Sequence, residues 1–159
     1  MTRHNRVVRR IGFCLLTLLL LAGCGGGGGG KRLSRQEFDS KGNAICAKYN
    51  AKQKSVAQPK NLNDLSPALR KLLPLARQQL DELKKLSPPQ SDDAAWKKLL
   101  ARAQEENDLV ANRLLPASDK KDVAKIQQLL NDLQTLDQQN NTDAQKLGLS
   151  TCAQQSASS

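Results

Sequence analysis

Residues 91–116 read SDDAAWKKLLARAQEENDLVANRLLP, and this segment indicates what kind of domain to expect. Its apolar residues recur three or four positions apart, which predicts an amphipathic helix with one buried face. That face comprises Trp96, Leu99, Leu100, Ala103, Val110 and Leu114. We expect the helix to begin at Ser91, because Asp92 and Asp93 then lie in its first turn, where negative charge suits the helix dipole. Pro116 is expected to end it.

The same spacing predicts two helices before this one. The first begins at Ser34, which forms a capping box with Glu37, and it ends before Pro59; its apolar stripe comprises Phe38, Ile45, Tyr49 and Val56. The second begins at Ser66-Pro67, since proline is favoured in the first helical turn, and it is kinked at Pro74. Its stripe runs from Leu69 through Leu72, Leu73, Ala76 and Leu80 to Leu83.

A fourth helix is expected from Ser118 or Asp119 to Leu147, with Gly148 as its C-terminal cap. Its apolar residues include Val123, Ile126, Leu129, Leu130, Leu133, Leu136 and Ala144. Four helices with short connections predict an all-α domain, an antiparallel up-and-down four-helix bundle with one disulfide, over residues 34–153. Residues 154–159 are expected to form a disordered polar tail.

The N-terminal segment has the pattern of an export signal. Four arginines among the first ten residues precede the apolar run from Ile11 to Ala22, which is too short to span a bilayer. Leu21-Ala22-Gly23-Cys24 resembles the bacterial lipobox, in which the cysteine is diacylglycerated and becomes the new N-terminus. The resemblance implies a signal peptide over residues 1–23 and a lipid anchor on Cys24, on the extracytoplasmic face of the cell membrane. An ordinary secretory signal with an incidental cysteine is the alternative.

Six glycines, Gly25 to Gly30, follow directly, so residues 24–33 are expected to form a flexible tether to the membrane. Two further cysteines, Cys46 and Cys152, lie near opposite ends of the mature domain. Export to an oxidising compartment favours a structural disulfide between them, which would close a loop of about 106 residues. A redox pair or a two-thiolate metal site is the alternative, although redox pairs usually lie close together in sequence.

Two short segments on the mature chain resemble a group of proteins. Asn43-Ala44-Ile45-Cys46 and Leu147-Gly148-Leu149-Ser150-Thr151-Cys152 are similar to paired signatures of small exported or lipid-anchored proteins of high-GC Gram-positive bacteria. The resemblance implies a helical domain, a bridge between Cys46 and Cys152 and a location in the cell envelope. It implies no particular activity.

The composition offers little for catalysis. The only histidine, His4, lies in the predicted signal peptide, so the mature chain lacks the imidazole of a triad or of a typical zinc site. Glu105, Glu106 and Asp108 form the densest acidic cluster, and we interpret them as a solvated helix face. We therefore expect no enzyme, no catalytic residues, no metal and no cofactor.

The net charge of +10 is unevenly distributed. Four of the charges belong to the signal peptide, and residues 31–60 carry the equivalent of the remaining +6. Lys41, Lys48 and Lys52 lie within about 40° of one another on a helical wheel. They either contact an anionic surface, lipid headgroups or wall polymer, or form the solvated side of a bundle helix. Nucleic acid is not expected as a partner, because the predicted location is extracytoplasmic and the one aromatic residue among these lysines, Tyr49, is expected to be buried.

Together these patterns predict a lipid-anchored, extracytoplasmic helical protein, a non-catalytic binding or structural module of the cell envelope with an unknown protein partner. An apolar small-ligand carrier or sensor, with a cavity between the helices near Pro74, is the alternative.

Overall fold

The computed structural model describes residues 31–153, and within this range the chain is helical with no strand. The fold class predicted from the sequence, all-α with one disulfide, is confirmed. The predicted signal peptide, Cys24, most of the tether and the C-terminal tail lie outside the described residues. No helix between residues 31 and 153 is long and apolar enough to cross a membrane.

Helix α1 spans Arg35–Lys54, and its start agrees with the sequence prediction. The Ser34 hydroxyl accepts a hydrogen bond from the Glu37 backbone N–H, while the Glu37 carboxylate accepts one from the Ser34 backbone N–H at 2.9 Å. This reciprocal capping box satisfies two of the amide groups that a helix N-terminus leaves unpaired. Phe38 and Tyr49, both predicted to be buried, are 0 % and 2 % exposed.

Helix α2 spans Leu62–Leu83 and begins four residues before the predicted start at Ser66. Asn61 is the N-cap, and its side-chain oxygen accepts from the Asn63 backbone N–H at 2.9 Å. The Ser66 hydroxyl instead donates to the Asp119 carboxylate. Pro67 and Pro74 therefore both lie inside one continuous helix.

The predicted boundary at Pro116 is also wrong. Helix α3, Asp93–Leu109, follows a single 3₁₀ turn, η1 (Gln90–Asp92), and continues through a π-helical segment, η2 (Val110–Leu114), into α4, Leu115–Asp119. The Leu115 N–H donates to the Val110 carbonyl, five residues back, so the turn is wider than an α-turn. This wider turn accommodates the proline, which would otherwise clash with the carbonyl four residues earlier.

Helix α5 spans Val123–Lys146 and begins after a turn in which Lys121 has a φ of 55°. Asp122, rather than Ser118 or Asp119, is its N-cap and accepts from the Lys125 N–H at 3.0 Å. Ser118 cannot serve as a cap because it lies buried at the end of α4, where its hydroxyl donates to the Leu114 carbonyl at 2.8 Å.

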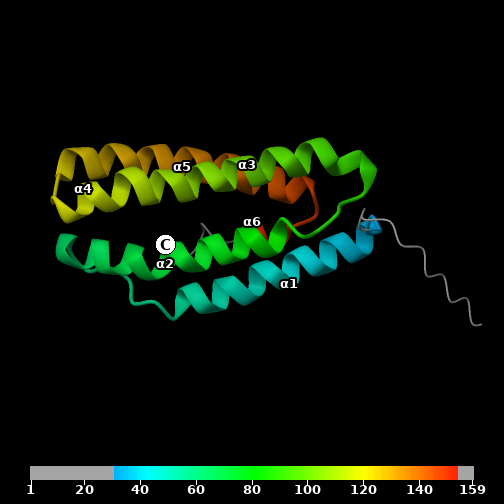
Figure 1. Cartoon of the computed structure of the whole chain (residues 1–159), viewed down its shortest axis with the longest axis horizontal. Coiled ribbons are helices and arrows are strands. Elements are labelled where there is room, and N and C mark those ends of the chain that lie inside the picture. The colour runs from blue at the N-terminus through cyan, green and yellow to red at the C-terminus, as the bar shows by residue number, and fades with distance from the viewer. Residues whose placement is uncertain (1–30, 154–159) are drawn as a thin grey trace, which may run out of the picture.

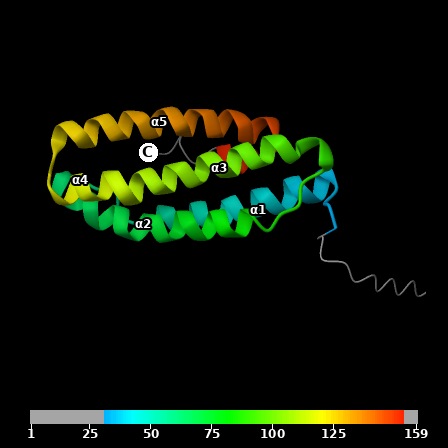
Figure 2. The ribbon, with the colours of Figure 1, turned by 45° about the horizontal axis from the view of Figure 1, so that its top comes forward.

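The long helices form two pairs, α1 with α2 and α3 with α5, and α2 also contacts α3 (Figures 1 and 2). Figure 1 shows that α1, α2, α3 and α5 run in alternating directions. A short helix, α6 (Ser150–Ala153), contacts both α1 and α5. The last described residues therefore return to the N-terminal helix.

Two separate apolar clusters form the core. The first surrounds the edge-to-face contact of Phe38 and Trp96, whose ring centroids are 5.1 Å apart, and includes Leu149. The second lies around Leu114 and Leu129, near the junction of α4 and α5. Val123 and Leu130, which were predicted to lie on the apolar stripe of α5, are 59 % and 45 % exposed.

The disulfide links α1 to α6. Cys46 and Cys152 are bonded, with their Cα atoms 5.0 Å apart. Gly148 caps α5 with a φ of 78°, a conformation that favours glycine, and Leu149 behind it is fully buried. The Asn43 amide donates to the Gly148 carbonyl at 2.9 Å and accepts from the Thr151 N–H at 2.8 Å. The two segments that carry the family resemblance thus contact each other directly.

Candidate functional site

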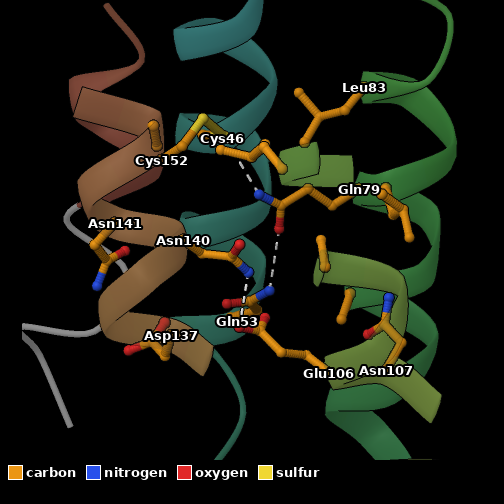
Figure 3. A pocket seen from close by; sticks show the side chains of 15 residues that line it. Cys46, Gln53, Gln79, Leu83, Glu106, Asn107, Asp137, Asn140, Asn141 and Cys152 are labelled. Atoms are coloured by element: carbon orange, nitrogen blue, oxygen red, sulfur yellow. Dashed lines mark hydrogen bonds between the residues drawn. A yellow bond between two sulfur atoms is a disulfide. The ribbon is translucent and has the colours of Figure 1, made fainter. Parts of the chain in front are cut away.

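A cavity of about 380 Å³ lies between the helices, beside the first core cluster. It is partly enclosed, and α1, α2, α3, α5 and α6 all contribute to its wall (Figure 3). A second hollow of about 810 Å³ shares Ala76, Glu106, Asn107, Asp137 and Asn141 with it and extends it along α5. A cavity between helices is therefore present, but it is only partly enclosed and its wall is partly polar, whereas the alternative interpretation of the sequence concerned a cavity for an apolar ligand.

The wall of the cavity has an apolar side and a polar side. Leu80, Leu83 and Leu99, with the Cys46–Cys152 disulfide, form the apolar side. Figure 3 shows Glu106, Asp137 and Asn140 together at the other end, with Gln53 beside them. Such a division suits a ligand that is apolar at one end and polar at the other.

Glu106 has the most unusual chemistry of the wall residues. The pKa of its carboxyl is raised from 4.5 to about 7, mainly by burial and also by the like charge of the nearby Asp137 carboxylate. Hydrogen bonding from Asn140, at 2.7 Å, and the positive charge of Arg102 oppose the rise in pKa. The interpretation of this acidic cluster as a solvated face is wrong for Glu106, although Glu105 and Asp108 are exposed.

Arg102 is engaged elsewhere, which explains why it does not neutralise Glu106. Its guanidinium donates to the Asp143 carboxylate at 2.9 Å and to the Asn140 side-chain oxygen at 3.3 Å. These contacts hold the pKa of Asp143 below its usual value and orient the Asn140 amide toward Glu106. Arg102 thus positions the polar end of the cavity without lining it.

Amide side chains complete the wall. The Gln79 amide donates to the Cys46 sulfur at 3.4 Å, and its oxygen accepts from Gln53 at 3.4 Å. Asn107 is only 7 % exposed and lines both hollows, yet its carboxamide makes no hydrogen bond to another described residue. Its oxygen and nitrogen are open to the hollows, so water or a ligand there can form hydrogen bonds with them.

The sequence contains a signal for these residues. The predicted apolar stripe of α3 is interrupted between Ala103 and Val110, where helical spacing places Glu106 and Asn107 on the buried face. The stripe of α5 is interrupted in the same way between Leu136 and Ala144, where Asp137, Asn140 and Asn141 lie. Polar residues at these stripe positions mark the cavity, and our interpretation of the sequence missed them.

The three lysines selected from the sequence are exposed along α1 but are not equivalent. The Lys48 ammonium forms an ion pair with Glu82 at 2.6 Å, and the Tyr49 hydroxyl donates to the same carboxylate at 2.8 Å. Lys52 lies over the Tyr49 ring, 4.8 Å from its centroid, and Lys41 forms no ion pair with another described residue. Contact of this face with an anionic surface stays a prediction.

Across residues 31–153, no group of three or more His, Cys, Asp or Glu side chains is arranged to hold a metal ion. Comparison of the chain with protein-family models, with curated proteins and with solved structures finds no match. The case for this site therefore depends on its geometry.

Proposed function

We propose that this protein is a lipid-anchored, extracytoplasmic, non-catalytic binding module of the cell envelope, and that the cavity between its helices is the binding site. The lipobox at Cys24 supports the anchor and the location. The observation that supports binding is the 380 Å³ cavity with its divided wall. Anchoring through the N-terminal tether would present the domain, and the cavity with it, close to the membrane surface.

A binding role accounts for features that a purely structural role leaves unexplained. A scaffold helix bundle is most stable when apolar side chains fill its interior, and buried polar groups without partners reduce that stability. Here Glu106 and Asn107 occupy positions on the buried face of α3 beside empty volume. Local departures of this kind from the best packing are typical of functional sites.

The lining favours a ligand with a polar end over the wholly apolar ligand of the alternative interpretation. It also favours binding over catalysis. The described wall residues include two carboxyls and several amides, but no hydroxyl, imidazole or amine. The two cysteines among them, Cys46 and Cys152, are bonded to each other, so neither offers a free thiol. We also assign the long helices to the up-and-down four-helix class, in which inter-helix sites of this kind are common.

Filling the cavity tests the proposal. Ala103 lines it from α3, so Ala103→Leu should occupy part of its volume. Ala95→Leu makes the same change at an exposed position of α3 and is the matched control. We expect the neutral fluorophore N-phenyl-1-naphthylamine to bind the wild-type chain and Ala95→Leu alike, and to bind Ala103→Leu at least fivefold more weakly. Equal binding by all three proteins would contradict the cavity as the site.

A further inference from the structure

The charge of the cavity wall is opposite to the charge of the protein. The mature chain carries a net charge of +6, since four of its 25 basic residues lie in the predicted signal peptide. The described residues that line the cavity and the adjoining hollow include Glu106 and Asp137 but no lysine or arginine. The nearest basic side chain that acts on Glu106, Arg102, is paired with Asp143 at 2.9 Å. The cavity therefore concentrates negative charge.

A second, independent feature points to a ligand at the same place. Asn107 is 7 % exposed and lines both hollows, and its carboxamide, which has no hydrogen-bond partner among the described residues, is open to them rather than sealed in the core. Its oxygen can accept a hydrogen bond beside the two carboxyls. The Asn107 side chain thus adds a hydrogen-bonding group, with an oxygen acceptor and an NH2 donor, to the cavity that Glu106 and Asp137 line.

We propose that the cavity binds a small amphiphilic organic cation, with its ammonium group between Glu106 and Asp137 and its apolar part against Leu80, Leu83 and Leu99. This inference depends on the proposed function, because it specifies the ligand class of the same cavity. The ammonium donates to the two carboxylates and to the Asn107 oxygen, and its charge relieves the repulsion between the carboxylates. The disulfide and the leucines exclude water from the apolar part.

A bare metal ion fits this site less well than an organic cation. Hard divalent cations require six or more oxygen ligands, whereas the described residues hold no group of three acidic or other metal-ligating side chains. The leucine side of the wall has no ligand for a metal ion, but it can pack against an alkyl or aryl group.

Three probes with the same aryl tail test the head group. We expect 2-phenylethylamine, protonated at pH 7.5, to bind at least tenfold more tightly than 2-phenylethanol, and 3-phenylpropanoate to bind most weakly. Binding is measured by calorimetry on the full mature chain in phosphatidylcholine nanodiscs, with empty nanodiscs as the reference for partitioning into lipid.

Variants then assign the effect to residues. Glu106→Gln and Asp137→Asn should each weaken amine binding at least tenfold while changing alcohol binding less than twofold. Glu105→Gln removes the same charge from an exposed neighbouring position of α3 and should leave amine binding unchanged. Circular dichroism verifies that each variant is folded.

The outcomes separate the two proposals. Equal binding of amine, alcohol and carboxylate would overturn the cation inference while supporting the cavity as a binding site. Amine binding that resists both Glu106→Gln and Asp137→Asn would also overturn the inference. Binding of none of the three probes, together with no binding of the neutral fluorophore, would overturn both proposals.

Discussion

The Glu106 carboxyl loses most of its contact with water on folding, and the Asp137 carboxylate adds like charge nearby. Its pKa is about 7 in the folded protein and 4.5 in an ordinary environment. Below pH 4.5 both the folded and unfolded chains hold the proton, so the group has no effect on stability. Between pH 4.5 and 7 the unfolded chain releases it first, and the free energy of unfolding falls as pH rises. Above pH 7 the free energy of unfolding has fallen by its full amount, which is at most about 3 kcal/mol.

Glu106→Gln should therefore stabilise the protein at pH 8, by roughly 1–3 kcal/mol, and change its stability little at pH 4. Glutamine keeps an oxygen that can accept the Asn140 hydrogen bond. The measurement is urea denaturation of wild type and variant across this pH range. Glu82 and other carboxyls with a lowered pKa make the free energy of unfolding rise with pH in both proteins. The difference between wild type and variant removes their contribution and leaves that of Glu106. A difference independent of pH would contradict the prediction.

At the scale of elements, the sequence predicts where helices exist better than where they begin and end. Apolar spacing identified all four long helices, because burial of one face dominates their stability. It misplaced the start of α2 because Ser66 pairs with Asp119, a residue that is distant in sequence but close in space. It misplaced the boundary at Pro116 because a wider π-helical turn lets the helix continue past the proline. These outcomes depend on tertiary contacts and backbone geometry that local patterns do not encode.

The polar wall of the cavity was missed for a related reason. Glu106 and Asp137 interrupt two different stripes, and each interruption on its own is typical of an exposed turn of helix. Only the pairing of α3 with α5 brings the two interruptions to one place. The disulfide, by contrast, followed from the compartment and from the number of cysteines, and it is confirmed.

The link between α1 and α6 gives a prediction at the same scale. Reduction of Cys46–Cys152 opens a loop with a sequence separation of 106 residues, and the chain-entropy model gives a loss of stability of about 5 kcal/mol at most. We expect reductant to lower the urea midpoint of the wild type strongly and to speed exchange of the Leu149 and Cys152 amides. A Cys46→Ser, Cys152→Ser double variant, already destabilised, should not respond to reductant. Complete reduction with an unchanged midpoint would contradict the prediction.

For the whole molecule, the excess of basic residues lies in the segment that follows the predicted tether. Residues 31–60 carry eight basic and two acidic side chains, whereas the segments beyond residue 90 are slightly acidic. Lys48 is partly neutralised by its ion pair with Glu82. Of the three lysines, Lys41 and Lys52 therefore have the more available charge for an anionic surface.

Lys41→Gln with Lys52→Gln should weaken binding to anionic vesicles by roughly tenfold at low salt, since each basic residue near such a surface contributes at most about 1 kcal/mol. The measurement is vesicle sedimentation of the mature chain carrying Cys24→Ala, so that no lipid anchor obscures the contribution of charge. Lys120→Gln with Lys121→Gln makes the same change at two exposed positions after α4, at the end of the molecule away from the tether, and is the matched control. Neutral vesicles should bind none of these chains, and added salt should abolish the difference between the variants. If both double variants weaken binding equally, net charge rather than the α1 face governs contact with the surface, and the orientation predicted from the lysines is wrong.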